Sequence, residues 1–186
     1  MTTYLILLRG INVGGKNKVP MADLKKCLEN LGFSNVMTYI ASGNVILASD
    51  QGAQEVRQDI EAALPKVFKL DSELIKVLVL SQAQLQAVVD NKPRGFGKLP
   101  DEYYSDVVFL MDITSVQAMP IFNPREGVDK VWSGDGVVYS QRLAALRTKS
   151  RLSSIVASPM YKSMTIRSWG TVTKLLALVK AAKTTG

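Results

Sequence analysis

The order of apolar segments in the first 80 residues constrains the fold of this chain more than any other feature. The predicted elements are a buried strand at Tyr4–Leu8, a helix opened by Pro20, two strands at 36–41 and 44–48, a helix at 53–64 and a strand at 74–80. This β-α-β-β-α-β order is that of a ferredoxin-like unit, in which two split βαβ units share one antiparallel sheet. The sequence therefore predicts an α+β protein that begins with a ferredoxin-like unit.

The second half of the chain resembles a looser copy of the first. Its predicted elements are strands at 107–111, 128–132 and 137–140, a short helix at 115–119 and a long helix at 168–182. No final strand is evident, so we predict an incomplete copy that arose by tandem duplication. The predicted domains are residues 1–80, a connecting helix and loop at 81–105, and a second α+β unit at 106–186 that carries a basic C-terminal segment.

Composition narrows the classes of protein to which the chain can belong. Hydrophobic residues make up 47% of its 186 residues, enough for a real core, and no apolar run approaches the roughly 20 residues of a membrane helix. We therefore expect a cytoplasmic protein with no membrane partner. Histidine is absent, which removes the usual zinc sites and histidine-based catalysis, and we expect no metal and no cofactor. The single cysteine, Cys27, shares helical spacing with Leu24, Leu28 and Leu31 and is predicted to be a packing residue.

Charge is distributed unevenly along the chain. Asp135 is the last acidic residue, and residues 136–186 hold nine Lys or Arg and no Asp or Glu. The first 135 residues hold 14 basic and 16 acidic groups. Such asymmetry is typical of a surface that faces a polyanion, although a solvated basic face that only aids solubility is the alternative.

A glycine-rich loop follows the first strand and leads into the first helix. Glycines bring backbone N–H groups close to a ligand, and a helix N-terminus adds the positive end of a dipole. In the ferredoxin-like sheet the end of the first strand lies beside the start of the third, so one rim gathers several polar groups. The pocket predicted there for an anion consists of Arg9, Asn12, Gly14, Gly15, Lys16, Ser42 and Asn44. The alternative is a structural loop whose Asn and Ser side chains bond its own backbone.

A second group of polar residues precedes the last helix. If helical geometry starts near Arg167, then Arg167, Thr171 and Lys174 fall on one stripe, and Trp169 faces the core. Two cations that flank a hydroxyl are suited to a phosphate or carboxylate, and these three residues complete the predicted ligand-binding set. The alternative is a solvated stripe with Trp169 as a packing anchor.

Several motifs resemble one known family. They are Leu7–Gly15, Val19–Met21, Leu31–Phe33, Tyr39-Ile40, Ser42–Val45 and the closing motif within 165–175. Together they are similar to the uncharacterised bacterial family called domain of unknown function 1697 (DUF1697). The resemblance implies a two-part α+β fold built on ferredoxin-like units, and it supplies no reaction, cofactor or catalytic residue. Ala41 and Ser168 stand where members often carry Gln and Asn.

These observations favour a binding protein for an anionic partner, either a nucleic acid or a phosphate-bearing small molecule. Base stacking in the manner of RNA-recognition domains is disfavoured, because Tyr4 is the sole aromatic residue on the two central strands. One alternative is an enzyme without histidine, metal or cofactor, whose catalytic residues are unknown and for which Tyr39 and Asp23 are candidate bases. Another is a structural or oligomer-forming module whose partner surface is an aromatic loop containing Phe96, Tyr103 and Tyr104. The oligomeric state stays open.

Overall fold

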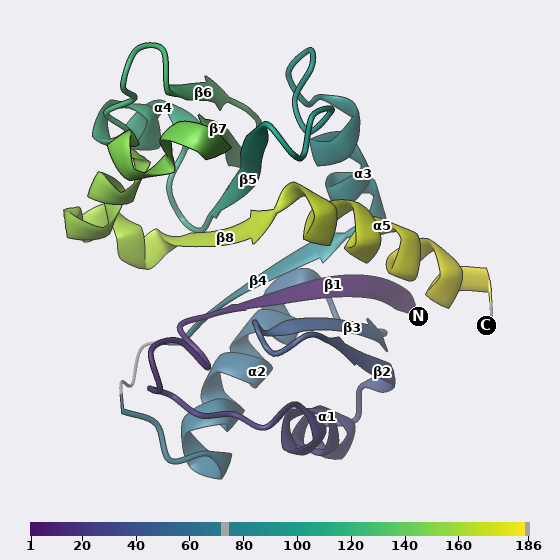
Figure 1. Cartoon of the computed structure of the whole chain (residues 1–186). Helices are drawn as coiled ribbons and strands as arrows, with labels where there is room; N and C mark the ends of the chain where they lie inside the picture. The colour runs from purple at the N-terminus through teal and green to yellow at the C-terminus, as the bar shows by residue number, and fades with distance from the viewer. Residues whose placement is uncertain (72–74, 185–186) are drawn as a thin grey trace. The chain divides into compact units, whose positions relative to one another are not determined.

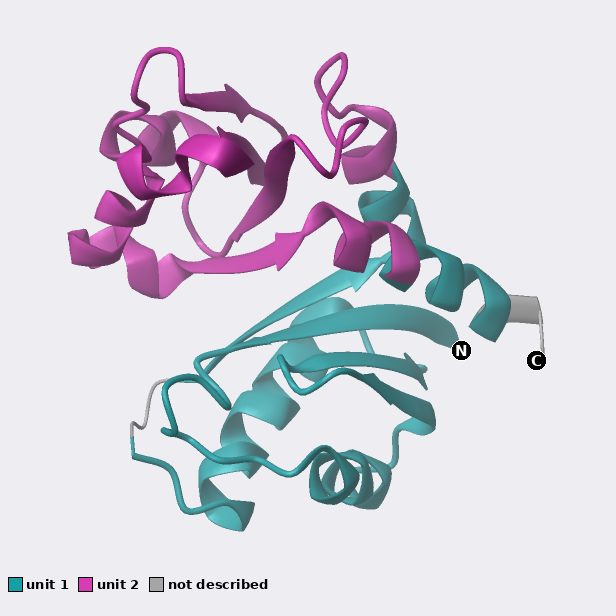
Figure 2. Cartoon of the chain, viewed as in Figure 1, with its two compact units in different colours: residues 1–86, 175–186 teal, residues 87–174 magenta. Residues whose placement is uncertain are grey.

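The chain folds as two compact units. The computed structural model describes residues 1–71 and 75–184. Unit 1 comprises residues 1–86 together with the described residues from 175 onward, and unit 2 comprises residues 87–174 (Figure 2). Each unit contains one four-stranded antiparallel sheet, so the predicted α+β class is confirmed.

Unit 1 has the predicted ferredoxin-like order of elements. They are β1 (Thr2–Arg9), α1 (Met21–Asn30), β2 (Ser34–Tyr39), β3 (Asn44–Ser49), α2 (Ala53–Val67) and β4 (Lys76–Ser81) (Figure 1). The strands lie in the order β2-β3-β1-β4, and each neighbouring pair is antiparallel. The predicted start of the last strand, Leu74, lies outside the described residues.

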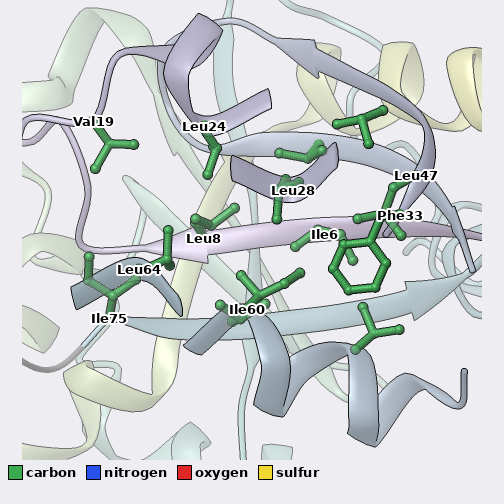
Figure 3. Close-up of a cluster of buried hydrophobic side chains, with 14 of the residues drawn as sticks. Ile6, Leu8, Val19, Leu24, Leu28, Phe33, Leu47, Ile60, Leu64 and Ile75 are labelled. Carbon is green, nitrogen blue, oxygen red and sulfur yellow. The ribbon is translucent and has the colours of Figure 1, made fainter. Parts of the chain in front are cut away.

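The core of unit 1 lies between one face of this sheet and the helices α1 and α2. Successive side chains of a strand alternate between faces, so Ile6 and Leu8 of β1 point to the same side. There they pack in one buried cluster with Leu28 of α1 and Ile60 of α2 (Figure 3). Burying each such side chain contributes about 1.5–3 kcal/mol to folding. Cys27 is also buried, as predicted for a packing residue.

Two details of the helices differ from the sequence prediction. Leu31, expected on the buried face of α1, caps the helix instead and is 38% exposed. Pro65 was expected to help end α2, but the helix continues to Val67. The helical hydrogen bonding continues past Pro65, since the backbone N–H of Phe68 bonds the Leu64 carbonyl oxygen at 2.9 Å.

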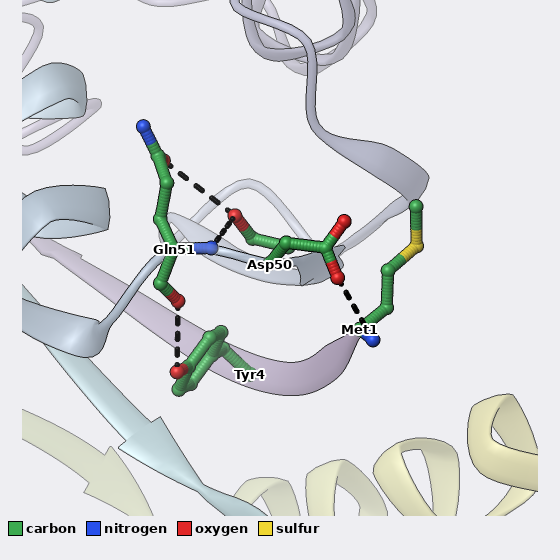
Figure 4. A network of polar contacts seen from close by, with 5 residues as sticks. Met1, Tyr4, Asp50 and Gln51 are labelled. Atoms are coloured by element: carbon green, nitrogen blue, oxygen red, sulfur yellow. Dashed lines mark hydrogen bonds and ion pairs between the residues drawn. The ribbon is translucent and has the colours of Figure 1, made fainter.

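A polar network ties the start of β1 to the segment between β3 and α2. The Tyr4 hydroxyl donates to the Gln51 carbonyl oxygen at 3.1 Å, and the N-terminal ammonium of Met1 pairs with Asp50 at 2.9 Å (Figure 4). Tyr4 is 8% exposed and belongs to the core cluster of unit 1. Its ring is therefore not free to stack on a base, in agreement with the argument against the RNA-recognition mode.

Unit 2 repeats the sheet of unit 1, but different helices accompany it. Its elements are β5 (Tyr103–Leu110), α4 (Ser115–Ala118), η1 (Met119–Ile121), β6 (Asp129–Ser133), β7 (Val137–Leu143), η2 (Ala144–Lys149), η3 (Leu152–Ala157), η4 (Pro159–Ser163) and β8 (Met164–Ser168), preceded by α3 (Gln82–Asp90) and followed by α5 (Trp169–Thr184). The strand order β6-β7-β5-β8 matches β2-β3-β1-β4 position by position. The two similar units agree with the predicted tandem duplication.

The prediction that the second copy lacks its final strand is wrong. That strand is β8, which pairs antiparallel with β5 just as β4 pairs with β1. What the copy lacks is the second long helix, whose place in the order is taken by the 3₁₀ helices η2, η3 and η4. Their sequence contains Pro159 and scattered serines, which favour short turns over a continuous α-helix.

An aromatic cluster forms part of the interior of unit 2. Phe96 is 1% exposed, and its ring centroid lies 5.3 Å from those of both Tyr139 and Trp169 in edge-to-face geometry. Gly97 follows with a φ of 74°, and a Cβ at this position would overlap the Trp169 indole. The aromatic loop is therefore divided: Phe96 packs inside, whereas Tyr104 is 43% exposed.

Candidate functional site

Asn12 organises the loop between β1 and α1. Its side-chain Nδ2 donates to the carbonyl oxygens of Val19 and Ala41, both at 2.9 Å, and its Oδ1 accepts from the Val19 N–H at 2.8 Å. Asn12 has a φ of 55°, a left-handed conformation that asparagine adopts more readily than most residues. One side chain thus closes the loop on itself and attaches it to the turn before β3.

The tip of the loop is a tight turn at Val13–Lys16. The Lys16 N–H donates to the Val13 carbonyl oxygen at 3.0 Å, and the two central residues, Gly14 and Gly15, have φ values of 59° and 76°. Positive φ at both central positions defines a type I′ turn, which glycine enters without steric cost. Gly14, Gly15 and Lys16 are all exposed.

The turn between β2 and β3 lies at the same edge of the sheet as the end of β1. Leu7 pairs with Asn44 in the register, and the Leu8 N–H donates to the Gly43 carbonyl oxygen at 2.8 Å. The predicted proximity of the end of β1 and the start of β3 is therefore correct. Gly43 has a φ of 81°, and a Cβ there would lie only 3.0 Å from atoms of Leu8 and Ile11.

The amide of Asn44 is also used by the fold. Its Nδ2 donates to the Tyr39 carbonyl oxygen at 3.0 Å and to the Ser42 hydroxyl at 2.9 Å, and the residue is fully buried. With Asn12, it supports the alternative in which polar side chains bond the loop backbone. Arg9 is half-buried at the end of β1, beside Lys76 of β4 in the register. A ligand at this edge stays a prediction.

The C-terminal residues do not form the predicted stripe. Arg167 belongs to strand β8, and α5 begins only at Trp169, so helical spacing does not relate Arg167 to Thr171 and Lys174. Arg167 is 7% exposed, and its Nη1 donates to the Thr165 hydroxyl at 2.9 Å and to the Ile166 carbonyl oxygen at 2.8 Å. Burial lowers the pKa of the Arg167 guanidinium to about 10.

The other residues of this group lie at the start of α5. The Thr171 hydroxyl lies 3.0 Å from that of Ser168, and the Thr171 N–H donates to the Ser168 hydroxyl at 3.3 Å. Ser168 thus caps the helix in the manner typical of serine. Lys174 is exposed, and Trp169 is half-buried against Phe96 rather than fully enclosed.

Four exposed cations of unit 2 lie in or next to two segments that one buried carboxylate joins. We call them the basic rim: Arg125, Arg147, Lys149 and Arg151. Asp129 Oδ2 accepts from the backbone N–H groups of Arg125 and Arg151, each at 2.9 Å, and Arg125 Nη1 donates to the Lys149 carbonyl oxygen at 3.2 Å. Within the described part of the chain, none of the four forms an ion pair.

Asp129 fixes this arrangement in its ionised form. Burial raises its pKa, but the N–H groups of Arg125 and Arg151, a hydrogen bond with Ser150 and the charge of Arg142 together outweigh that effect and lower it below its ordinary value. One carboxylate therefore joins the segment before β6 to the segment after η2. Sequence inspection missed this role because Asp129 and Arg151 are 22 residues apart.

A pocket of about 430 Å³ opens on unit 1, with lining residues from α1 and α2. Its lining includes Cys27, but burial raises the pKa of that thiol, which disfavours the reactive thiolate. Asp23, one candidate base, also lines the pocket, whereas Tyr39 does not. In residues 1–71 and 75–184, no three acidic or cysteine side chains gather closely enough to hold a metal ion. In that same part of the chain, no helix has the length and apolarity needed to cross a membrane.

Comparison with known proteins gives a family and a fold. The family model described as "Protein of unknown function (DUF1697)" matches residues 1–139. The conserved bacterial protein SP0830 from Streptococcus pneumoniae has a similar structure, with a TM-score of 0.74 and 26% sequence identity over 96% of this chain and 98% of that one. No curated protein matches the chain. The closing motif at 165–175 lies beyond the part matched by the family model.

Proposed function

We propose that this chain, which belongs to the DUF1697 family of proteins of unknown function, binds nucleic acid through the basic rim. The family assigns no activity, so the geometry of unit 2 has to supply the support. The observation that carries the proposal is a group of exposed cations without ion pairs, on two segments that the buried Asp129 carboxylate joins through the backbone N–H groups of Arg125 and Arg151. Phosphate contacts from Lys and Arg supply essentially all the affinity of non-specific nucleic-acid binding.

The electrostatic balance at the rim favours an anionic partner. The ionised Asp129 offsets one charge and the exposed Glu126 offsets a second, so the four cations leave a local excess of positive charge. The rim also belongs largely to the segment after Asp135, in which no acidic residue is present to neutralise it. Unpaired surface cations are costly to gather, because they repel one another, and a polyanion removes that cost.

A nucleic acid suits the rim better than a single small anion. All four side chains are exposed, whereas a site for a small ligand encloses most of the ligand surface. Duplex DNA presents one negative charge per roughly 1.7 Å of helix axis, so several exposed cations can each meet a phosphate. The loop residues Arg9 and Lys16 and the helix residue Lys174 stay further candidates for phosphate contacts.

The experiment is a binding titration of fluorescently labelled duplex DNA and single-stranded RNA by anisotropy. Each phosphate contact contributes roughly a factor of eight at 0.1 M salt, so the double variant Arg147→Ser/Lys149→Ser should bind roughly 60-fold more weakly. The matched control is Lys66→Ser/Lys69→Ser, which removes the same charge from exposed positions of unit 1. Equal weakening by both pairs would show that net charge alone is responsible, and would contradict the proposal.

A further inference from the structure

A second cavity, of about 190 Å³, lies within unit 2. It is lined by polar side chains of the sheet and by apolar side chains that include Phe122, Leu152 and Ile155. A single ordered water needs only roughly 10–15 Å³, so this cavity has room for a molecule of several heavy atoms. Part of its wall comes from η3, through Leu152, Ser153, Ile155 and Val156. In the order of elements, η3 stands where unit 1 has its second long helix, which unit 2 lacks.

Strand register brings three polar side chains to this cavity. Asp106 of β5 pairs with Ser140 of β7, and Arg142 follows Ser140 by two positions, so all three point to the same face of the sheet. All three line the cavity. Their separation in the sequence hides the grouping, because only the pairing of β5 with β7 places Asp106 beside the other two.

The hydrogen-bonding capacity of these groups is largely unused within the fold. The Nε of Arg142 is buried and has no hydrogen-bond partner. In the described part of the chain, neither the Asp106 carboxyl nor the Ser140 hydroxyl makes a hydrogen bond, and Arg142 forms no ion pair. Buried polar groups are satisfied in the great majority of native structures, so the unpartnered Nε of Arg142, beside the half-buried Asp106 at the same cavity, points to a ligand.

The groups around Arg142 leave its guanidinium available to a ligand. Its guanidinium lies 5.5 Å from the centroid of the Tyr104 ring, a cation–π contact that leaves the N–H groups available. The charge of Arg142 also lowers the pKa of Asp129, but the Oδ2 atom of Asp129 is already bonded to backbone N–H groups. Burial raises the pKa of Asp106, and the charge of Arg142 acts in the opposite direction.

We propose that this cavity binds a small zwitterion of the amino-acid type that carries an apolar side chain. The ligand carboxylate pairs with Arg142, its ammonium group pairs with Asp106, and Ser140 hydrogen-bonds between them. The apolar side chain of the ligand packs against Phe122 and Leu152. A guanidinium and a carboxylate on one wall match the two charges of such a ligand, whereas a simple anion leaves Asp106 unpaired and repelled.

The test is a calorimetric titration of the whole chain with leucine, leucinamide and 4-methylpentanoate. Leucinamide lacks the carboxylate and 4-methylpentanoate lacks the ammonium group, so each should bind roughly ten- to a hundredfold more weakly than leucine. Arg142→Gln should abolish the advantage of leucine over leucinamide, and Asp106→Asn should abolish its advantage over 4-methylpentanoate. Arg151→Gln, an exposed neighbour outside the cavity lining, should leave leucine binding unchanged and weaken nucleic-acid binding.

Several outcomes would overturn this inference. Equal affinity for leucine and 4-methylpentanoate would exclude a role for Asp106, and equal affinity for leucine and leucinamide would exclude one for Arg142. Absence of saturable binding by leucine, isoleucine, valine and phenylalanine at roughly 10 mM would exclude the ligand class. The ligand comparison uses the unaltered chain, so it decides the matter even if a cavity variant fails to fold. Loss of nucleic-acid binding alone would leave this inference intact.

Discussion

Replacing Asn12 by alanine should destabilise unit 1 by about 4 kcal/mol. The change removes three hydrogen bonds of 2.8–2.9 Å, each worth about 1 kcal/mol net. It also places alanine at a φ of 55°, where a Cβ-bearing residue without a local hydrogen bond loses roughly 1 kcal/mol more.

Asn35 provides a matched control for the cost of placing alanine at a positive φ. Its φ is 52°, and in the described part of the chain its exposed side chain makes no hydrogen bond. Asn35→Ala should therefore cost only about 1 kcal/mol, and the difference between the two variants isolates the hydrogen bonds of Asn12.

Hydrogen exchange followed by NMR is the appropriate assay, because a chain of two units need not unfold in one step. In Asn12→Ala the amide of Val19, which loses its acceptor Asn12 Oδ1, should exchange much faster than in Asn35→Ala. Equal free-energy losses in the two variants, or an unchanged Val19 exchange rate, would refute the view that Asn12 closes the loop.

Three further predictions concern unit 2. Gly97→Ala should destabilise it by about 2 kcal/mol or more and alter the near-ultraviolet circular dichroism, since the new Cβ overlaps Trp169. Tyr139 donates to the Val88 carbonyl oxygen, and burial raises the pKa of its hydroxyl to about 12. Its stabilising effect is therefore complete below pH 10 and is lost as the pH rises towards 12. The loss of unfolding free energy in Tyr139→Phe, measured by urea denaturation, should shrink over that range. The lowered pKa of Asp129 gives stability that is present above its ordinary value of 3.8 and lost as the pH falls below it, so Asp129→Asn should flatten the acid limb of a thermal-melting profile.

The sequence was sufficient to predict the sheet of unit 1 because its signals are local. Apolar runs such as Tyr4–Leu8, the tight connection at Ser42-Gly43 and the spacing of Leu24 and Leu28 each report on neighbours in the chain. The topology then placed Asn44 near the end of β1, and the register agrees. What could not be predicted was that the Asn44 amide bonds the backbone.

The errors fall where a long-range contact overrides a local pattern. The predicted stripe of Arg167, Thr171 and Lys174 requires helical geometry to start near Arg167, which belongs instead to β8. The alternating burial of residues 165–168, with Arg167 inside, is imposed by pairing with β5, which lies more than fifty residues earlier. The cavity around Asp106 and the anchoring role of Asp129 were missed for the same reason, since both depend on strand register and loop closure rather than on a motif.

The salt dependence of nucleic-acid binding tests the central claim most directly. If the four cations of the basic rim each meet a phosphate of duplex DNA, the slope of log K against log salt should be about −3.6, and affinity should fall roughly 150-fold between 50 and 200 mM salt. The slope should halve in Arg147→Ser/Lys149→Ser and stay unchanged in Lys66→Ser/Lys69→Ser. A slope near zero, or no binding at roughly 50 mM salt, would contradict nucleic-acid binding through the rim.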